Sequence, residues 1–191
     1  MALDASTIII VAVVIIALIV IVWVIGRKRR TETLRRRFGP EYERTVREQG
    51  PSKAETVLLE RKQRVEKFPI RALSASERER FISEWRGVQS RFVDDPKGAV
   101  TEAEKLVVQV MQARGYPMSD FEQRAADISV DHPQVVDNYR AAHEIALRHR
   151  RGEATTEDLR NAMLYYRSLF DDLLQTRSVN ERKIDDRREV A

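Results

Sequence analysis

The pattern of apolar and polar residues separates one uniformly apolar segment from a long amphipathic remainder. Residues 8–25 contain only Ile, Val, Ala, Leu and one Trp. A helix in a soluble protein carries a polar face, whereas this segment would be apolar on every side. At about 1.5 Å per residue it would extend roughly 27 Å, close to the roughly 30 Å hydrocarbon core of a bilayer. The sequence therefore predicts a transmembrane helix over 8–25.

Beyond this segment, apolar residues recur every three or four positions, which is typical of amphipathic helices. Glycine and proline residues separate the stretches, because proline and the residue before it disfavour a continuing helix. No stretch alternates between apolar and polar residues for long, so no β-sheet is predicted. The predicted helices are 41–49, 53–67, one from Ser74 through Phe92, one from Asp95 to Gly115, a short one from Ser119 to Ala126, one from Asp131 to Gly152, and one from Thr155 through Leu173.

Short polar residues in front of the apolar stretches are predicted to cap the helix N-termini. A Ser or Thr followed three residues later by an acidic residue matches the capping box, in which the two side chains bond reciprocally to backbone N–H groups. The predicted caps are Ser52 with Glu55, Ser74 with Glu77, Asp95 before Pro96, Ser119, Asp131 before Pro133, and Thr155 with Asp158.

These elements predict an all-α protein with an N-terminal transmembrane helix, a charged helical arm and a compact antiparallel bundle of about four helices. The last segment is predicted to be disordered because nearly all of its residues are polar. The predicted segments are a short extracytoplasmic N-terminus (1–7), the transmembrane helix (8–25), a basic juxtamembrane collar (26–38), the helical arm (39–73), the helical bundle (74–176) and the disordered tail (177–191).

Positive charge gathers directly behind the apolar segment. Residues 27–37 hold seven Lys or Arg and one Glu, a net charge of +6, whereas the whole chain carries only +4. The rest of the chain is therefore slightly acidic, and the basic character belongs to the collar. A nucleic-acid-binding domain spreads basic residues over a folded face, so no nucleic-acid partner is expected.

The one-sided charge also predicts an orientation. Residues 1–7 contain no Lys or Arg, whereas the collar follows the apolar segment. The positive-inside rule then places the N-terminus outside and the C-terminal domain in the cytoplasm. A cleaved signal peptide is disfavoured, because it needs a basic N-terminal region and a small-residue cleavage site. We therefore expect a single-pass membrane protein.

The collar is expected to contact anionic headgroups of the lipid bilayer, which attract basic residues next to a membrane span. A tryptophan near the end of the apolar segment suits the same interface, where amphipathic aromatic rings gather. The predicted membrane-interface residues are Trp23, Arg27, Lys28, Arg29, Arg30, Arg35, Arg36 and Arg37.

The sequence lacks the common catalytic and cofactor-binding motifs. It contains no Cys, which excludes disulfides, thiolate metal sites and Cys nucleophiles. No two of its seven glycines lie closer than 11 residues, which excludes the dinucleotide-binding, P-loop and nucleophile-elbow motifs. We therefore expect no enzyme activity, no cofactor and no metal.

Three residues remain candidates for a partner surface: Arg114, Tyr116 and His143. Arg114 and Tyr116 belong to a predicted loop before Pro117, which could serve a partner or simply end the helix. His143 lies on the apolar face of its helix near Tyr139, where we expect a histidine at the edge of the core that bonds to a neighbour. A proton-transfer or ligand-binding role is the alternative for His143.

Five stretches of the sequence resemble a group of uncharacterised bacterial single-pass membrane proteins. The stretches are GPEYERTV (39–46), SRFVDDP (90–96), MQARGYP (111–117), FEQRAADISVDHP (121–133) and NYRAAHEIALRHRRGEATTEDLRNAM (138–163). The resemblance covers roughly residues 35–175. It implies a bacterial source, an N-terminal anchor in the inner membrane and a helical remainder, and it assigns no role to any residue.

The sequence thus favours a membrane-tethered cytoplasmic interaction module that binds a protein partner or a second copy of itself. One alternative is a structural stalk or homo-oligomeric scaffold, although the chain breaks at 39–40, 50–51 and 68–69 disfavour a continuous rod. The other alternative is a sensor or enzyme that uses His143.

Overall fold

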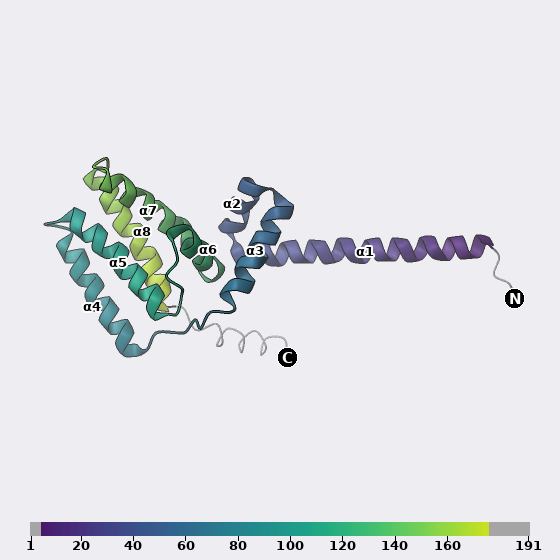
Figure 1. Cartoon of the computed structure of the whole chain (residues 1–191), viewed down its shortest axis with the longest axis horizontal. Coiled ribbons are helices and arrows are strands. Elements are labelled where there is room, and N and C mark those ends of the chain that lie inside the picture. The colour runs from purple at the N-terminus through teal and green to yellow at the C-terminus, as the bar shows by residue number, and fades with distance from the viewer. Residues whose placement is uncertain (1–4, 176–191) are drawn as a thin grey trace.

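The computed structural model describes residues 5–175, and within them all side chains except those of 5–13, 17 and 23. This part of the chain forms eight helices and no strand, which confirms the all-helical prediction (Figure 1). The predicted tail (177–191) and residues 1–4 of the predicted N-terminal segment lie outside the described residues. The helices are α1 (Ala5–Phe38), α2 (Pro40–Gln49), α3 (Pro51–Val65), α4 (Ala75–Arg91), α5 (Pro96–Ala113), α6 (Phe121–Asp131), α7 (Val136–Arg150) and α8 (Thr156–Gln175).

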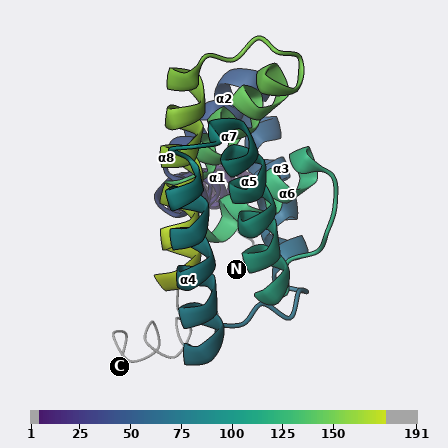
Figure 2. The same ribbon diagram turned by 90° about the vertical axis from the view of Figure 1, so that its left-hand side faces the viewer.

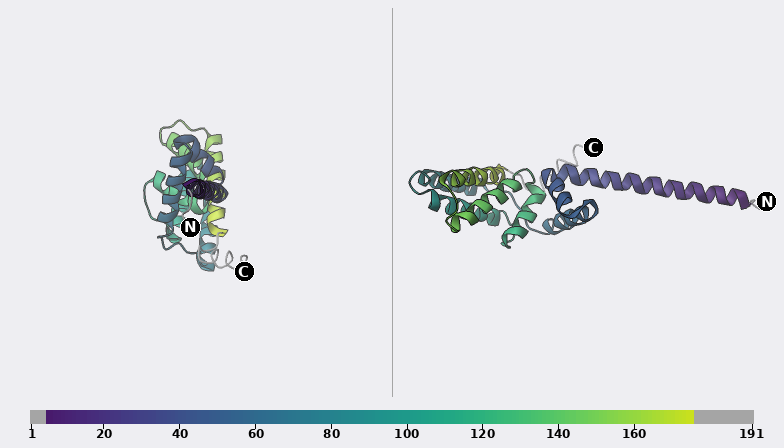
Figure 3. Two further views of the ribbon diagram at one scale, coloured as in Figure 1. Left: turned by 90° about the vertical axis from the view of Figure 1, so that its right-hand side faces the viewer. Right: turned by 90° about the horizontal axis from the view of Figure 1, so that it is seen from above.

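Helix α1 runs without interruption from the apolar segment through the basic collar. It ends before Gly39, whose φ of 47° lies in the left-handed region, and Pro40 then begins α2. The predicted collar (26–38) is therefore the C-terminal part of one long helix that projects away from the other seven (Figures 1 and 3). Judged on the described side chains, no helix has a stretch long and apolar enough to cross a membrane, so the span over 8–25 stays a prediction.

The last turns of α1 pack with α2, α3 and α6 around a hydrophobic cluster that we call the small core. Its fully buried members include Phe38 at the end of α1 and Leu58 in the middle of α3. The helical arm predicted over 39–73 thus folds against the base of α1. The small core consists of Leu34, Phe38, Tyr42, Leu58, Val65 and Val130.

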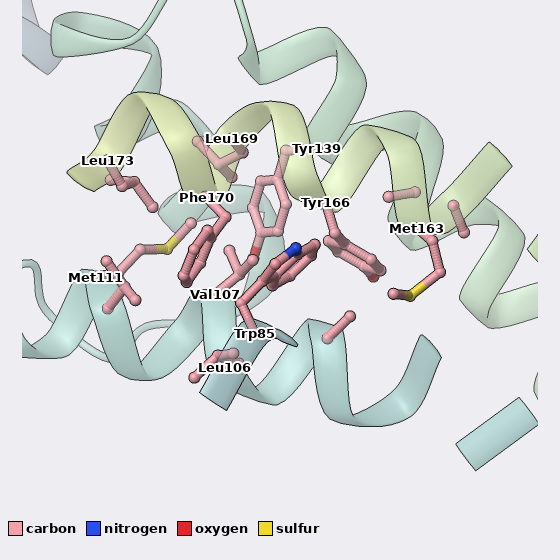
Figure 4. Packing of buried hydrophobic residues seen from close by; sticks show 14 of the residues in the cluster. Trp85, Leu106, Val107, Met111, Tyr139, Met163, Tyr166, Leu169, Phe170 and Leu173 are labelled. Carbon is pink, nitrogen blue, oxygen red and sulfur yellow. The ribbon is translucent and has the colours of Figure 1, made fainter. Parts of the chain in front are cut away.

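A larger cluster, which we call the main core, lies among α4 to α8 and confirms the predicted helical bundle. It contains 26 buried residues, and α4, α5, α7 and α8 run alongside one another around it (Figure 2). The rings of Trp85 and Phe170 stack, with centroids 4.6 Å apart and planes 21° apart. Figure 4 labels both side chains within the cluster. Tyr139 and Tyr166 fill the space beside this pair. The bundle has a fifth, shorter helix, α6, of 11 residues.

Three of the predicted N-terminal caps are confirmed, all in the bundle. Ser74 and Glu77 form the reciprocal capping box at the start of α4. The Asp95 side chain accepts a hydrogen bond from the Gly98 N–H at the start of α5. At the start of α8, Thr155 Oγ1 accepts from the Asp158 N–H at 3.1 Å. These caps involve residues three positions apart, so local sequence is sufficient to specify them.

The predicted cap at Ser52 is wrong. Helix α3 begins at Pro51 after Gly50, and no side chain caps it, because proline already fixes the backbone angle of the first helical residue. Ser52 is consequently inside the helix. Glu55, the expected partner of Ser52, instead accepts a hydrogen bond from the Thr31 hydroxyl of α1 at 2.6 Å.

The predicted boundaries around α6 are also wrong. Asp120, not Ser119, caps α6 by accepting a hydrogen bond from a backbone N–H. The helix continues past its predicted end, because Val130 is buried in the small core. Asp131 ends α6 instead of starting α7, and its carboxylate accepts a hydrogen bond from the Tyr116 hydroxyl at 3.0 Å. The residue before α7, Val135, offers no side-chain cap.

The segment between α3 and α4 runs against the C-terminal end of α5. The Arg71 N–H donates to the Arg114 carbonyl at 2.9 Å. Gly115 has a φ of 93°, and a Cβ atom there would lie 2.5 Å from the Pro69 carbonyl oxygen. This close approach requires glycine, and it holds the connection between the small core and the main core in one place.

Candidate functional site

The basic residues of α1 form the first candidate site. The described side chains at 27–30 and 35–37 are all exposed, although this stretch of helix is anchored by two buried neighbours, Leu34 and Phe38. The Arg35 guanidinium pairs with Glu43 of α2 at 2.7 Å. Because the base of α1 is packed into the small core, the predicted interface residues stand on a rigid support. Trp23, the remaining predicted member, has its side chain outside the described atoms.

A buried cluster of charged side chains joins the helices around the small core to the bundle. Glu41, at the start of α2, is only 1% exposed. Its carboxylate accepts hydrogen bonds from the two terminal guanidinium nitrogens, Nη1 and Nη2, of Arg140 of α7, at 2.7 and 2.9 Å. It also accepts one from Arg61 of α3 at 2.7 Å. One carboxylate therefore ties three helices together, in the bidentate geometry that makes such pairs directional.

The cluster keeps Glu41 charged in spite of its burial. Burial by itself raises the pKa of this carboxyl, but the hydrogen bonds and charges of Arg140 and Arg61 outweigh it and hold the pKa below its ordinary value. A buried carboxylate that lost these partners would be strongly destabilising. The position of α2 beside α7 thus depends on all three side chains being in place.

A second carboxylate, that of Asp127 of α6, is also buried, at 1% exposed. It accepts hydrogen bonds from Arg64 of α3 at 3.1 Å and from Gln123 at 2.8 Å. Burial raises the pKa of the Asp127 carboxyl, and the lowering effects of Gln123 and Arg64 do not cancel it. Relative to its ordinary pKa, the Asp127 carboxyl is therefore less stabilised in its charged form than the Glu41 carboxyl. Its cationic partner, Arg64, remains half exposed to water, which weakens the attraction.

An open hollow of about 670 Å³ lies beside His143, between α6 and α7. The His143 ring stacks on Phe121, with centroids 3.6 Å apart and planes 10° apart. Its Nδ1 lies 3.0 Å from Glu104 Oε1 on α5, so this histidine is bonded to a neighbour at the edge of the core, as the sequence predicted. The wall carries charges of both signs, from Arg44, Asp120, Glu122, Asp137, Arg140 and Glu144.

The other two predicted partner-surface residues, Arg114 and Tyr116, do not lie at the surface. Arg114 is fully buried and Tyr116 is 3% exposed, so neither is available to a partner. The Arg114 guanidinium donates a hydrogen bond to the backbone carbonyl of Leu173 in α8, at 2.7 Å. Tyr116 packs in the main core and bonds to Asp131. Both are buried because the turn after α5 is covered by α8 and by the end of α6.

A buried histidine that the sequence did not single out lies at the turn between α6 and α7. His132 is 2% exposed, and its Nδ1 hydrogen bonds to Asp172 of α8. Its other ring nitrogen, Nε2, is buried with no hydrogen-bond partner among the described atoms. The pair joins the α6–α7 turn to the end of α8.

The described side chains offer no group of three His, Asp or Glu residues that could hold a metal ion. Comparison with known protein families, curated proteins and solved structures found no match to this chain. The resemblance to bacterial membrane proteins therefore stays a prediction.

Of the functional candidates, the sequence found the basic residues of α1 and His143 but missed Glu41, Arg61 and Arg140. The sequence offered little signal for Glu41: Thr45, one turn further along the predicted helix 41–49, is also polar, and the burial of both appears only in the structure. A buried carboxylate requires a cationic or hydrogen-bonding partner. No pattern identifies that partner, because Arg140 lies 99 residues further along the chain.

Proposed function

We propose that this protein is a membrane-tethered helical module, held by α1 in a bilayer, that presents the hollow beside His143 to a protein partner. One observation supports the proposed membrane anchor. The described apolar side chains of α1 from Val14 to Ile25 are each about half exposed or more, from 48% to 69%. The same continuous helix ends inside the small core.

Such a row of bare apolar side chains is unfavourable in water, where burial of each would contribute about 1.5–3 kcal/mol. The adjoining basic side chains suit the anionic headgroups of a cytoplasmic leaflet. A helix also satisfies its own backbone hydrogen bonds, which a membrane span requires. These properties support insertion of residues 8–25 with the domain on the cytoplasmic side.

The interaction role is supported by the hollow beside His143. It is open to solvent, and its lining combines the stacked rings of His143 and Phe121 with charged side chains of both signs. Rigid aromatic side chains within a polar rim are typical of protein-recognition surfaces. Most residues that line the hollow come from α6 and α7 or the residue before α6. These helices lie away from the N-terminal part of α1 (Figure 1), so a bilayer around that part would not cover the hollow.

The tether is tested with the full chain expressed in bacteria and alkaline carbonate washing of the membranes. The wild-type chain is expected to stay in the membrane pellet. The double substitution Ile16→Arg with Ile19→Arg places two charges in the bilayer centre, each costing about 2.5–3.5 kcal/mol, and is expected to move the chain to the supernatant. Both residues are about 60% exposed, so the domain itself should fold normally.

The matched control is Val93→Arg with Leu164→Arg, which changes two exposed apolar residues on the bundle. This variant is expected to remain in the membrane pellet. Release of the wild-type chain by carbonate would refute the tether. Protection of the C-terminal domain from protease added outside spheroplasts tests the orientation, and digestion there would reverse it.

The partner surface is tested by placing a photo-crosslinking amino acid at Ala141, which lines the hollow. A specific adduct is expected from Ala141 and not from the exposed control position Thr101 on α5. Glu144→Lys, a charge reversal on the rim, is expected to reduce the adduct. No adduct from Ala141 in intact cells would count against a partner in this hollow, and an adduct with a second copy would identify self-association.

A further inference from the structure

Helices α2 and α3 form a hairpin at the C-terminal end of α1 (Figure 1), and the first turns of α3 lie beside the residues that follow the apolar part of α1. Ser52 and Thr56, in the first turns of α3, line a hollow of about 520 Å³ together with Gly26, Arg27 and Arg30 of α1. The Thr31 hydroxyl of α1 bonds to Glu55 of α3 in the same region. The tip of the hairpin, by which we mean the end of α2 and the first turns of α3 (residues 47–56), therefore lies beside the first turns of α1 that follow the apolar segment.

This placement sets the height of the tip relative to a bilayer. Thr31 comes six residues after Ile25, which is about 9 Å along a helix. The headgroup layer on each side of a hydrocarbon core is roughly 5–8 Å thick. Long basic side chains at the tip would consequently reach the phosphates of the layer in which α1 enters the membrane.

The tip carries such side chains. Arg47 near the end of α2 and Lys53 near the start of α3 are both exposed, and neither forms an ion pair within the described part of the chain. Of the nearby acidic residues, Glu48 pairs with Arg44 at 3.0 Å, whereas Glu55 keeps its negative charge while it accepts a hydrogen bond from the Thr31 hydroxyl. The tip thus presents two exposed cationic side chains, Arg47 and Lys53, with no described carboxylate within ion-pair distance.

We propose that the α2–α3 tip, through Arg47 and Lys53, is a second contact with the anionic headgroups of the membrane that α1 spans. The inference rests on the proposed tether and deepens it. A single helix leaves the domain free to tilt relative to the bilayer. A second contact beside α1 restrains that tilt and determines which side of the bundle faces away from the membrane.

The test uses the full chain in vesicles, and the natural absence of Cys allows single labels to be introduced. Ser52→Cys at the tip, Val20→Cys in the apolar segment and Ser90→Cys at the far end of α4 each receive a fluorophore. Headgroup-nitroxide lipids quench a label in the headgroup layer, and acyl-chain nitroxide lipids quench one in the hydrocarbon core. Vesicles are either zwitterionic or contain about one third phosphatidylglycerol.

The label at position 52 is expected to be quenched by headgroup nitroxides in anionic vesicles, less in zwitterionic ones, and less at high salt, which screens the attraction. The label at position 90 should remain unquenched throughout. Acyl-chain quenching at position 20 reports the tether separately. If position 20 is quenched and position 52 is not, the tether holds and the tip contact is refuted. If position 20 is not quenched, the tether itself fails.

A charge variant sharpens the test. Arg47→Gln with Lys53→Glu removes two positive charges and adds one negative charge, so the net charge falls by three; both helices remain able to form, because an acidic residue in the first turn of α3 suits the helix dipole. Each positive charge removed is expected to lower the ratio of bound to free tip roughly fivefold at low salt. The control, Lys97→Glu with Lys105→Gln on α5, makes the same charge change and should leave position 52 quenched. Equal quenching in the two variants would overturn the proposal.

Discussion

The small core and the main core stabilise their helices in different ways. The main core contains 26 buried residues and gathers four aromatic rings, Trp85, Tyr139, Tyr166 and Phe170, at its centre. The small core has six buried apolar residues and is flanked by the buried carboxylates Glu41 and Asp127. The first relies on apolar area, and the second combines a little apolar area with directional ion pairs.

The difference suits the positions of the two cores. A buried ion pair contributes little net stability, because desolvation offsets the attraction, but it tolerates few alternative geometries. The small core joins α1 to the bundle through Glu41 and Arg140, so the direction in which α1 leaves the domain is set by charge pairing. The main core does not determine the direction of α1, so apolar packing is sufficient to hold its helices together.

The largest expected effect is in the main core. Phe170→Ala removes the ring that stacks on Trp85 and leaves a cavity, which is expected to lower the free energy of unfolding by about 3–5 kcal/mol. Urea unfolding followed by circular dichroism measures this loss. A loss below about 1 kcal/mol, typical of a surface site, would show that the main core does not hold the bundle in this way.

Glu41→Gln tests the small core. It keeps the shape of the side chain but removes the charge that Arg140 and Arg61 surround, and is expected to cost about 3 kcal/mol. Hydrogen exchange should show faster exchange in α2 and α3 while α5 and α8 keep their protection. Uniform loss of protection across both regions would mean that the two cores unfold as one unit, contradicting the distinction drawn between them.

The connection between the cores gives a smaller effect. Gly115→Ala forces a positive φ on alanine and brings its Cβ against the Pro69 carbonyl, with an expected loss of about 2–3 kcal/mol. Gly152→Ala is the matched control, because its φ of 77° is similar but nothing lies within 4 Å of the added Cβ. It should cost only about 1 kcal/mol. Equal thermal-unfolding shifts in the two variants would show that the contact with Pro69 has no effect.

The smallest expected effect is a change in how the stability of the fold depends on pH. Glu41 stabilises the fold above its ordinary pKa of 4.5, and this contribution is lost as the pH falls through the lowered folded value. Asp127 has a raised pKa and acts in the opposite direction, since its protonation favours the folded state as the pH falls through the raised value. Stability should therefore fall less steeply with acid in Glu41→Gln than in the wild type, and more steeply in Asp127→Asn. Urea midpoints between about pH 6 and pH 3 measure the slopes, and parallel slopes in all three proteins would refute this assignment.

The local features of the fold were predictable from the sequence. Ser74 with Glu77 and Asp95 with Gly98 bond within one helical turn, so their neighbours in sequence are sufficient. At Ser52 the prediction failed because α3 begins before this residue, at Pro51, and Glu55 bonds to Thr31 of α1. At Asp131 it failed because the carboxylate bonds to Tyr116, a distant residue, and does not cap α7. A cap is only one of several hydrogen bonds open to such a residue, and tertiary packing selects among them.

By itself, then, the sequence determined that the chain is helical, roughly where most of its helices lie, and where its apolar segment and the adjoining basic residues are, because periodicity, composition and charge are local properties. Only the tertiary structure decided that Arg114 is buried, that His132 meets Asp172, and that Glu41 and Arg140 join the two cores. It also placed the α2–α3 tip beside the first turns beyond the apolar segment. These pairings depend on which helix faces meet in space, and residues 40 to 99 positions apart carry no local sign of each other.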